Sequence, residues 1–285
     1  MTSQSDPVPA DSPALPEGVG RTALGVAGVR AFESERPDRL FDDPYAHLFL
    51  RAAGVPDGFR RPPSEARVAM ARHIVLRTRF FDDYLQQAAA DGLRQVVLLA
   101  AGLDARAFRL PWPAGTRLFE LDLPESLAFK EGVLRRAGAR PRCARTVLPV
   151  DLREDWATAV AGAGFDPAEP TAWLIEGLLI YLGKEAAAAL LETVGRLSAP
   201  GSRLALVHSG MRETVRLSRE DAGMSAATSL WRGGLGADPA LWLGHRGWDI
   251  RPYGTAELAA AYGTARPEVA GAGTTFLIAT RRADA

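Results

Sequence analysis

Continuous apolar runs recur through the central part of the chain, each four to six residues long. A strand covered on both faces of a sheet has this pattern, whereas a half-buried strand alternates apolar and polar residues. We therefore predict five buried strands followed by one more strand near the C-terminus. The predicted strands span residues 96–101, 117–121, 146–150, 172–175, 203–208 and 274–280.

Helical stretches separate the first five runs, which gives a repeating strand–helix order. They span residues 104–110, 124–137, 154–163 and 184–197. Strands that alternate with helices in this way form a mostly parallel sheet with helices on both faces. The pattern predicts an α/β protein with a doubly wound sheet.

The chain before the first strand has a different texture. Residues 1–20 are rich in Pro, Ser, Asp and Gly without apolar periodicity, which predicts a disordered lead. Residues 21–91 read as a helical segment, with one helix near 22–32 and a second after the turn at 42–45. Ser64 follows two prolines and is a suitable N-cap for a long third helix ending near Ala90.

Residues 92–285 form the predicted catalytic core, but residues 211–254 interrupt its rhythm. This stretch holds Trp231, Trp242 and Trp248 among several glycines, where an α/β unit normally closes quickly. We interpret it as an insertion that caps the active site, although a lid or an oligomer interface would give the same pattern. The tryptophans suit either an aromatic acceptor or a hydrophobic core.

Composition narrows the class of protein. The 285 residues are 47% hydrophobic and 24% charged, as in ordinary globular proteins, and 34 basic residues balance 34 acidic ones. Such a balance gives no cationic field for nucleic acid or a membrane surface, and we expect neither partner. With Cys143 as the single cysteine we expect no disulfide and no metal site. The sequence shows neither a secretory signal nor a membrane-spanning stretch, so we expect a cytoplasmic protein.

Polar residues at the strand ends are the first candidates for a binding site, because ligands of open α/β sheets lie beyond the carboxyl ends of the strands. Gly102 follows the first strand and permits a tight turn, while Asp122 ends the second. Asp151 follows the third strand, and Glu176 stands within an otherwise apolar segment after the fourth. A buried acid requires a cation or hydrogen bonds as compensation.

Each of these residues also has a purely structural interpretation. Gly102 marks a turn that any α/β protein needs, and Asp104 beside it is a suitable helix cap. Asp122 is either a ribose ligand or a solvated loop residue. Asp151 fits an adenine contact, with Leu152 on the ring face, or a helix N-cap with Glu154 at capping-box spacing.

Taken as an ordered set, several motifs resemble one known family. They are Thr22-Ala23, Asp42-Asp43-Pro44-Tyr45-Ala46, Arg77-Thr78-Arg79-Phe80-Phe81-Asp82-Asp83-Tyr84-Leu85, Ala101-Gly102-Leu103-Asp104-Ala105-Arg106, Phe119-Glu120-Leu121-Asp122-Leu123-Pro124, Val150-Asp151-Leu152 and Glu176-Gly177-Leu178-Leu179-Ile180-Tyr181. The set resembles the leucine carboxyl methyltransferase family in its bacterial, actinobacterial-type branch, over roughly residues 21–210. The resemblance implies a Rossmann-like class I methyltransferase fold with S-adenosyl-L-methionine as cofactor.

The resemblance also implies a role for each matching residue. Arg77 would bind the methionine carboxylate of the cofactor, with Arg79 as the less favoured choice. Gly102 would face the methionine portion, Asp122 the ribose, and Asp151-Leu152 the adenine. Glu176 would lie near the sulfonium and amino end. Ala100 and Ala101 depart from the glycine-rich first loop usual in methyltransferases.

Methyl transfer is an in-line displacement that depends mainly on positioning and exclusion of water. A carboxylate acceptor is already ionised at pH 7 and needs no base, whereas a hydroxyl benefits from one. Our candidates for catalytic roles are Glu176, Tyr181 and His208, with His208 the preferred base among His47, His73, His208 and His245. Tyr181 and His208 have equally simple structural interpretations.

We expect a small-molecule acceptor, with a carboxylate as first choice and a hydroxyl as second. Similarity to polyketide carboxyl methyltransferases points to an acid of secondary metabolism. The chain lacks the G-x-G-x-x-G of nicotinamide enzymes, the G-x-S-x-G of serine hydrolases, and the acidic-or-Asn-Pro-Pro-aromatic motif of amine methyltransferases. A non-catalytic cofactor-binding or scaffold protein remains the alternative, and a homodimer is left open.

Overall fold

The computed structural model describes residues 19–55, 64–209, 229–236, 238–264 and 274–283. Within these ranges one seven-stranded sheet organises the molecule, in the order β3-β2-β1-β4-β5-β7-β6. Its strands are β1 (Gln95–Leu99), β2 (Arg117–Asp122), β3 (Ala144–Pro149), β4 (Thr171–Ile175), β5 (Arg203–Ser209), β6 (Trp248–Gly254) and β7 (Thr274–Arg281).

The first five strands are parallel, and β7 runs antiparallel between β5 and β6. All six strands expected from the apolar runs are present, which confirms the mostly parallel α/β sheet. Because β1 lies between β2 and β4, the carboxyl ends of these strands lie side by side at one edge of the sheet.

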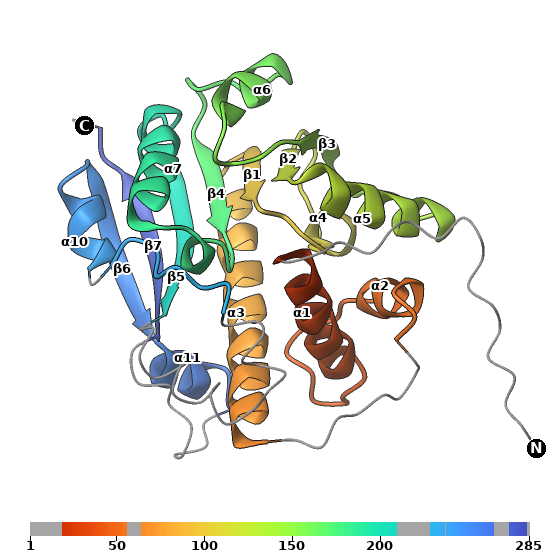
Figure 1. Cartoon of the computed structure of the whole chain (residues 1–285). Coiled ribbons are helices and arrows are strands. Elements are labelled where there is room, and N and C mark those ends of the chain that lie inside the picture. The colour runs from red at the N-terminus through yellow and green to blue at the C-terminus, as the bar shows by residue number, and fades with distance from the viewer. Residues whose placement is uncertain (1–18, 56–63, 210–228, 237, 265–273, 284–285) are drawn as a thin grey trace, which may run out of the picture.

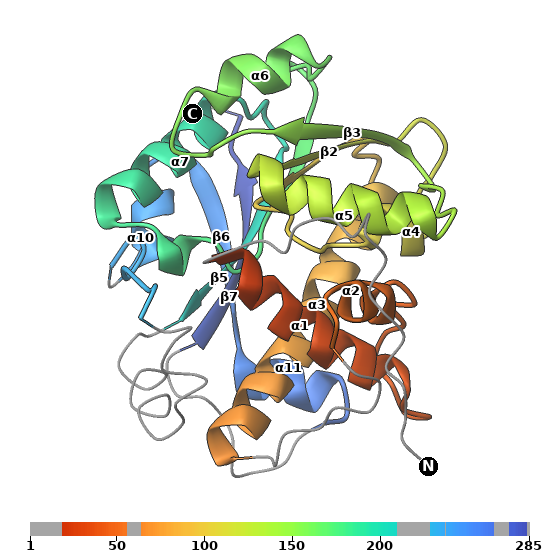
Figure 2. The same cartoon turned by 45° about the vertical axis from the view of Figure 1, so that its right-hand side comes forward.

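Helices cover both faces of this sheet, as Figures 1 and 2 show. One face packs against α3 (Glu65–Ala90), α4 (Arg106–Arg109), α5 (Pro124–Arg136) and α11 (Thr255–Ala261). The other packs against α6 (Trp156–Gly162), α7 (Lys184–Arg196) and α10 (Pro239–Gly244). Successive strand residues enter opposite cores, since Val96 and Leu98 belong to the first and Val97 and Leu99 to the second.

The N-terminal helices lie beyond the carboxyl edge of the sheet. They are α1 (Val19–Ser34) and α2 (Ala46–Ala52), and they pack on each other while α1 also packs on α3. The N-terminal half of α3 extends past the strands into the same region (Figure 1). Ser64 accepts a hydrogen bond from the backbone nitrogen of Arg67, which confirms it as the N-cap of α3.

The segment that we assigned to a cap requires a correction. Residues 239–244 form α10 and residues 248–254 form β6, the edge strand of the core sheet. Trp248 is 1% exposed and belongs to the second core, so it is not part of a cap. Pro252 hid this strand in the sequence, although proline is compatible with an edge strand. Residues 210–228, like residues 1–18 of the expected lead, lie outside the described residues.

The described helices include none that is both long and apolar enough to cross a membrane. The longest, α3, carries three carboxylates and four arginines along its 26 residues.

Candidate active site

The turn after β1 forms the floor of the candidate site. Ala100 and Gly102 both have positive φ angles, of 56° and 47°. Glycine adopts this left-handed conformation freely, whereas alanine does so only at a cost of about 1–2 kcal/mol. A Cβ atom at Gly102 would lie 3.6 Å from the Cβ of Ala23 on α1, so the turn and the helix leave little room beside this backbone.

Asp122 at the end of β2 faces the same turn. Its Oδ2 accepts a hydrogen bond from the backbone nitrogen of Gly102 at 2.5 Å, and its Oδ1 accepts one from Leu123 at 2.7 Å. Burial raises the pKa of Asp122 above its ordinary value, although the two backbone hydrogen bonds partly offset this. The carboxylate is therefore fixed in orientation beside Gly102, which agrees with the predicted convergence of these two residues.

Asp151 follows β3 and binds Arg153 in the structure. Both its oxygens accept hydrogen bonds from the Arg153 side chain, and this interaction lowers the pKa of Asp151. Leu152 packs against the second core. The alternative role of Asp151 as a helix N-cap with Glu154 is wrong, because Asp155 caps α6 by accepting from Thr158.

Glu176 lies directly after β4 and accepts hydrogen bonds from two arginines. Arg77 donates through Nε to Oε1 at 2.9 Å, and Arg106 donates through Nη1 to Oε2 at 2.7 Å. Burial raises the pKa of Glu176, but the guanidinium groups of Arg106 and Arg77 outweigh this and hold it below its ordinary value. The compensation expected for this acid therefore comes from the protein itself.

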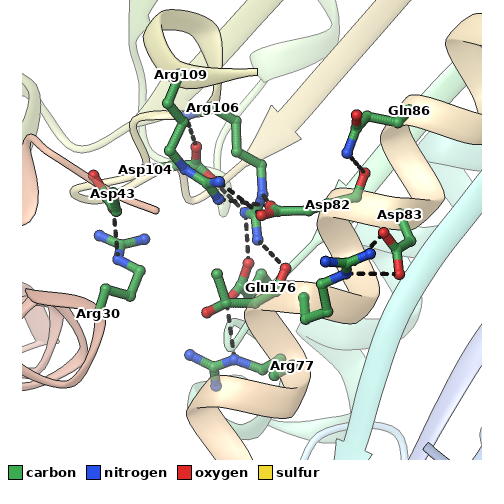
Figure 3. A network of polar contacts seen from close by, with 12 residues as sticks. Arg30, Asp43, Arg77, Asp82, Asp83, Gln86, Asp104, Arg106, Arg109 and Glu176 are labelled. Atoms are coloured by element: carbon green, nitrogen blue, oxygen red, sulfur yellow. Dashed lines mark hydrogen bonds and ion pairs between the residues drawn. The ribbon is translucent and has the colours of Figure 1, made fainter. Parts of the chain in front are cut away.

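Arg106 and its partners form the part of the site that sequence reasoning missed. Asp82, Asp104 and Glu176 all bind the Arg106 side chain, which is fully buried (Figure 3). Arg109 adds two hydrogen bonds of 2.6 Å to Asp82. All of these residues except Arg109 stood in the family motifs, but nothing in the sequence shows that an arginine of one motif contacts an acid of another.

The two candidate arginines of α3 point to different places. The Nε of Arg77 donates to Glu176, and its Nη1 lies 3.4 Å from the Cβ position of Gly177. Among the described residues, no partner engages the terminal nitrogens of Arg77. Arg79 instead binds Asp83 and the carbonyl oxygen of Leu40. The role of Arg77 as the ligand of the cofactor carboxylate stays a prediction.

No contact between described residues joins Tyr181 or His208 to the ion pairs of Arg106 and Glu176. The Tyr181 hydroxyl donates to Thr22 Oγ1 at 3.3 Å and so links the turn after β4 to α1. His208 continues the alternation of Leu204 and Leu206, which places it on the face opposite α3. Burial lowers the pKa of His208. Their catalytic roles stay predictions.

His73 lies close enough to Arg77 and Glu176 for their charges to act on its imidazole. It stands four residues before Arg77 on α3, and so on the same side of the helix, with its ring 5.7 Å from that of Phe276. Burial, followed by the charge of Arg77, lowers the pKa of His73 to about 3, and Glu176 opposes this shift. Its imidazole is therefore neutral at pH 7.

Two surface hollows lie away from this edge. One, of about 420 Å³, is lined by Phe108, Arg135 and Arg145 near the end of α5. The other, of about 400 Å³, lies beside β6 and Tyr84. Neither hollow is lined by Gly102, Asp122, Asp151 or Glu176. In the described ranges, no group of three histidine, cysteine or acidic side chains is placed to bind a metal ion.

The described residues fit S-adenosyl-L-methionine. The terminal nitrogens of Arg77 suit its carboxylate, and the fixed Asp122 carboxylate beside Gly102 suits its ribose hydroxyls. Asp151 is 21% exposed at its side chain, which leaves it accessible to an adenine amino group. When bound, the cofactor supplies a methyl group activated by its sulfonium.

Comparison with known proteins agrees with this geometry. The model of the leucine carboxyl methyltransferase family matches residues 23–195. A relative from Parafrankia, named for S-adenosyl-L-methionine-dependent methyl transfer, is 57% identical over 240 residues, covering 81% of this chain and 77% of its own. A relative of the same name from Streptomyces avermitilis is 49% identical over 253 residues, with coverage of 87% and 89%.

Solved structures share the fold at low sequence identity. A DUF574 family protein from Streptomyces avermitilis has a TM-score of 0.60 at 14% identity, covering 90% of this chain and 96% of its own. Magnesium protoporphyrin IX methyltransferase from Synechocystis, solved with bound S-adenosylhomocysteine, has a TM-score of 0.50 at 14% identity, with coverage of 93% and 100%.

Fold, strand-end residues and relatives together define an S-adenosyl-L-methionine-dependent methyltransferase. Within that class, the chain belongs to the leucine carboxyl methyltransferase family. The alternative of a non-catalytic scaffold is thereby set aside.

Proposed function

We propose that this enzyme transfers the methyl group to an oxygen atom of a small molecule, with a carboxylate as the preferred acceptor and a hydroxyl as the second candidate. Nucleic acid is not among the proposed substrates. The family name supports a carboxyl acceptor. The Glu176-Gly177-Leu178-Leu179 sequence after β4 supports oxygen over nitrogen, because amine methyltransferases carry a different motif there.

One observation supports a carboxylate most directly: the acids at this edge are already paired. Glu176 binds two arginines, Asp122 binds two backbone nitrogens, and Asp151 binds Arg153. The arginines lower the pKa of Glu176 and Asp151 and so make both poor proton acceptors, while both oxygens of Asp122 are occupied by backbone N–H donors. An acceptor that is already ionised needs no base.

A neutral histidine favours the second candidate. His208 lies at the end of β5, and burial lowers its pKa, so its imidazole is neutral at pH 7 and can accept a proton; His73 is neutral too, but a pKa of about 3 makes it a much weaker proton acceptor. A hydroxyl acceptor has a proton to lose as the methyl–oxygen bond forms, and an imidazole within reach would accept it.

The test is transfer of an isotope-labelled methyl group to a panel of small carboxylic acids, phenols, alcohols, amines and nucleic acid. Mild alkali then separates the products, because a methyl ester releases labelled methanol and a methyl ether does not. We expect alkali-labile label in the acids, with inhibition by added S-adenosylhomocysteine as the control. Label confined to amines or nucleic acid would refute oxygen methylation, and alkali-stable label in phenols alone would make the hydroxyl the acceptor.

A further inference from the structure

Six charged side chains form one continuous ion-pair cluster beneath the candidate cofactor site (Figure 3). Three are arginines and three are acids, so their formal charges cancel. They come from α3, from the turn after β1, from α4 and from the residue after β4. The members are Arg77, Asp82, Asp104, Arg106, Arg109 and Glu176.

Arg106 is the centre of this cluster. Its Nε donates to Asp82 at 2.6 Å, its Nη1 donates to Asp104 and to Glu176, and its backbone nitrogen donates to Asp104. Its Nη2 donates to the carbonyl oxygen of Thr78 at 3.3 Å. A planar guanidinium with five donors can serve several oxygens in fixed directions, which a lysine ammonium cannot reproduce.

Asp82 holds Arg106 in place from the far side. Its carboxylate also receives both terminal nitrogens of Arg109, so it is fixed by two arginines and is 3% exposed. The Nε of Trp112 donates to the backbone oxygen of Arg106 at 2.9 Å. Arg106 therefore has a defined position that does not depend on Glu176.

Glu176 stands between Arg106 and Arg77. Arg106 binds one of its oxygens and the Nε of Arg77 binds the other, which fixes both the carboxylate plane and the Arg77 guanidinium. No residue that the structure describes binds the terminal nitrogens of Arg77, so in our assignment they bind the ligand. Without Arg106, Glu176 loses its more deeply buried partner. Neither the plane of the Glu176 carboxylate nor the Arg77 guanidinium is then fixed.

We propose that Arg106 is a positioning residue for the amino-acid end of the cofactor, acting through Glu176 and, through Glu176, on Arg77. It does not touch the cofactor in this assignment. The role concerns cofactor binding alone, so it holds whether the acceptor is a carboxylate or a hydroxyl.

The charged surroundings of Glu176 define a distinctive pH dependence. Arg106, Arg77 and, from α1, Arg30 stabilise its ionised form, whereas Asp104 opposes it. His73 also senses the Glu176 charge, but it is neutral above about pH 3. Loss of the Arg106 charge leaves burial only partly compensated, so Glu176 takes up a proton at a higher pH than in the wild type.

The experiment is isothermal calorimetry with S-adenosylhomocysteine from pH 8 to pH 5 on Arg106→Gln, Arg106→Lys and the wild type. For R106Q we expect affinity weakened about tenfold at pH 8, the scale of one hydrogen bond to a charged group, and a further fall relative to wild type as the pH drops. For R106K we expect weaker binding than wild type, because a lysine ammonium lacks the planar set of donors of the guanidinium. We expect a wild-type pH profile, because the positive charge remains.

The matched control is Arg145→Gln. Arg145 is a second well-buried arginine, bound to Glu120 and Glu131 at the other end of β3 from Asp151. R145Q removes a comparable ion pair and should leave the pH profile of S-adenosylhomocysteine affinity unchanged. Loss of affinity by R106Q that is equal at every pH, or a profile for R145Q like that of R106Q, would overturn the proposal.

R106K keeps the proposal testable if R106Q does not fold. A folded R106K that binds S-adenosylhomocysteine as tightly as the wild type would show that the fork geometry of Arg106 positions nothing, and the proposal would be abandoned. Because binding is measured without an acceptor, failure here leaves oxygen methylation untouched, and failure of the labelling experiment leaves Arg106 untouched.

Discussion

Ala100 carries a left-handed backbone conformation that alanine rarely adopts, two residues before Gly102 with the same conformation. Strain of this kind persists where surrounding structure enforces it, and it concentrates at functional sites. Here β1, β2 and their backbone hydrogen bond from Ala101 to Leu121 hold the turn in place. The glycine expected in methyltransferases is therefore replaced without loss of the backbone path.

Gly102→Ala should weaken the binding of S-adenosylhomocysteine several-fold and lower the free energy of unfolding by about 1 kcal/mol, since alanine at φ 47° is strained. Ala100→Gly is the matched control. Strain relief at residue 100 and greater flexibility of the unfolded chain oppose each other, so its stability should change by less than about 1 kcal/mol. Calorimetry and urea denaturation measure both quantities. Undiminished binding by G102A would contradict a cofactor pressed against this turn.

His73 predicts a pH-dependent stability. Burial, with the charge of Arg77, lowers its pKa to about 3 in the folded state, against about 6.5 when unfolded. Below pH 6.5 the unfolded state thus binds the extra proton. Stability from a neutral His73 is complete above that pH and falls towards pH 3, by at most about 1.4 kcal/mol per pH unit.

The measurement is urea denaturation of wild type and His73→Gln between pH 7.5 and pH 4.5. Carboxylate titrations common to both proteins cancel in the difference between their free energies of unfolding. That difference should move in favour of H73Q as the pH falls below 6.5. A constant difference would mean that His73 titrates normally in the folded protein.

How far the site could be predicted depends on the kind of contact. Asp122 and Glu176 were predictable because the ends of parallel strands meet at one edge. The ion pairs of Arg106 were not, because Asp82 and Glu176 reach it from segments 24 and 70 residues away. Sequence position says nothing about such pairing, and an arginine on a helix is ordinarily solvated.

At the scale of elements, β6 is the strand that the hydrophobic pattern did not predict. The buried strands were evident from their apolar runs, but β6 exposes most of its residues at the sheet edge and contains Pro252. Trp248 marks the exception, since it is 1% exposed and packs in the second core. The polar residues of β6 and its proline thus gave no strand signal, although β6 forms one edge of the sheet.

Trp248→Ala should destabilise the protein by about 3–5 kcal/mol, as expected when a buried tryptophan is truncated. Leu241→Ala is the control, because Leu241 lies on α10 and is 59% exposed. The control should cost about 1 kcal/mol or less, since little apolar surface is lost from the core. Urea denaturation distinguishes the two, and equal effects would contradict the assignment of Trp248 to the core.

At the scale of the whole molecule, we predict that strand ends far apart in sequence bind one ligand, so the ligand should stabilise the entire fold. S-adenosylhomocysteine at 100 times its Kd is expected to raise the free energy of unfolding by about 2.7 kcal/mol. In a protein that carries both Asp122→Ala and Asp151→Ala, this gain should vanish. Thermal denaturation with and without ligand measures it, and an undiminished gain in the folded double variant would remove these two acids from the site.

Lysine is nearly absent from this chain, with Lys130 and Lys184 as its two examples. The amine of Lys130 is fully buried against Glu120 at 2.6 Å, whereas Lys184 is exposed at the start of α7. Reagents that acylate amines should therefore attach to one side chain, apart from the α-amino group. A dye or surface linker coupled in this way would report from a single known point on the second face of the sheet.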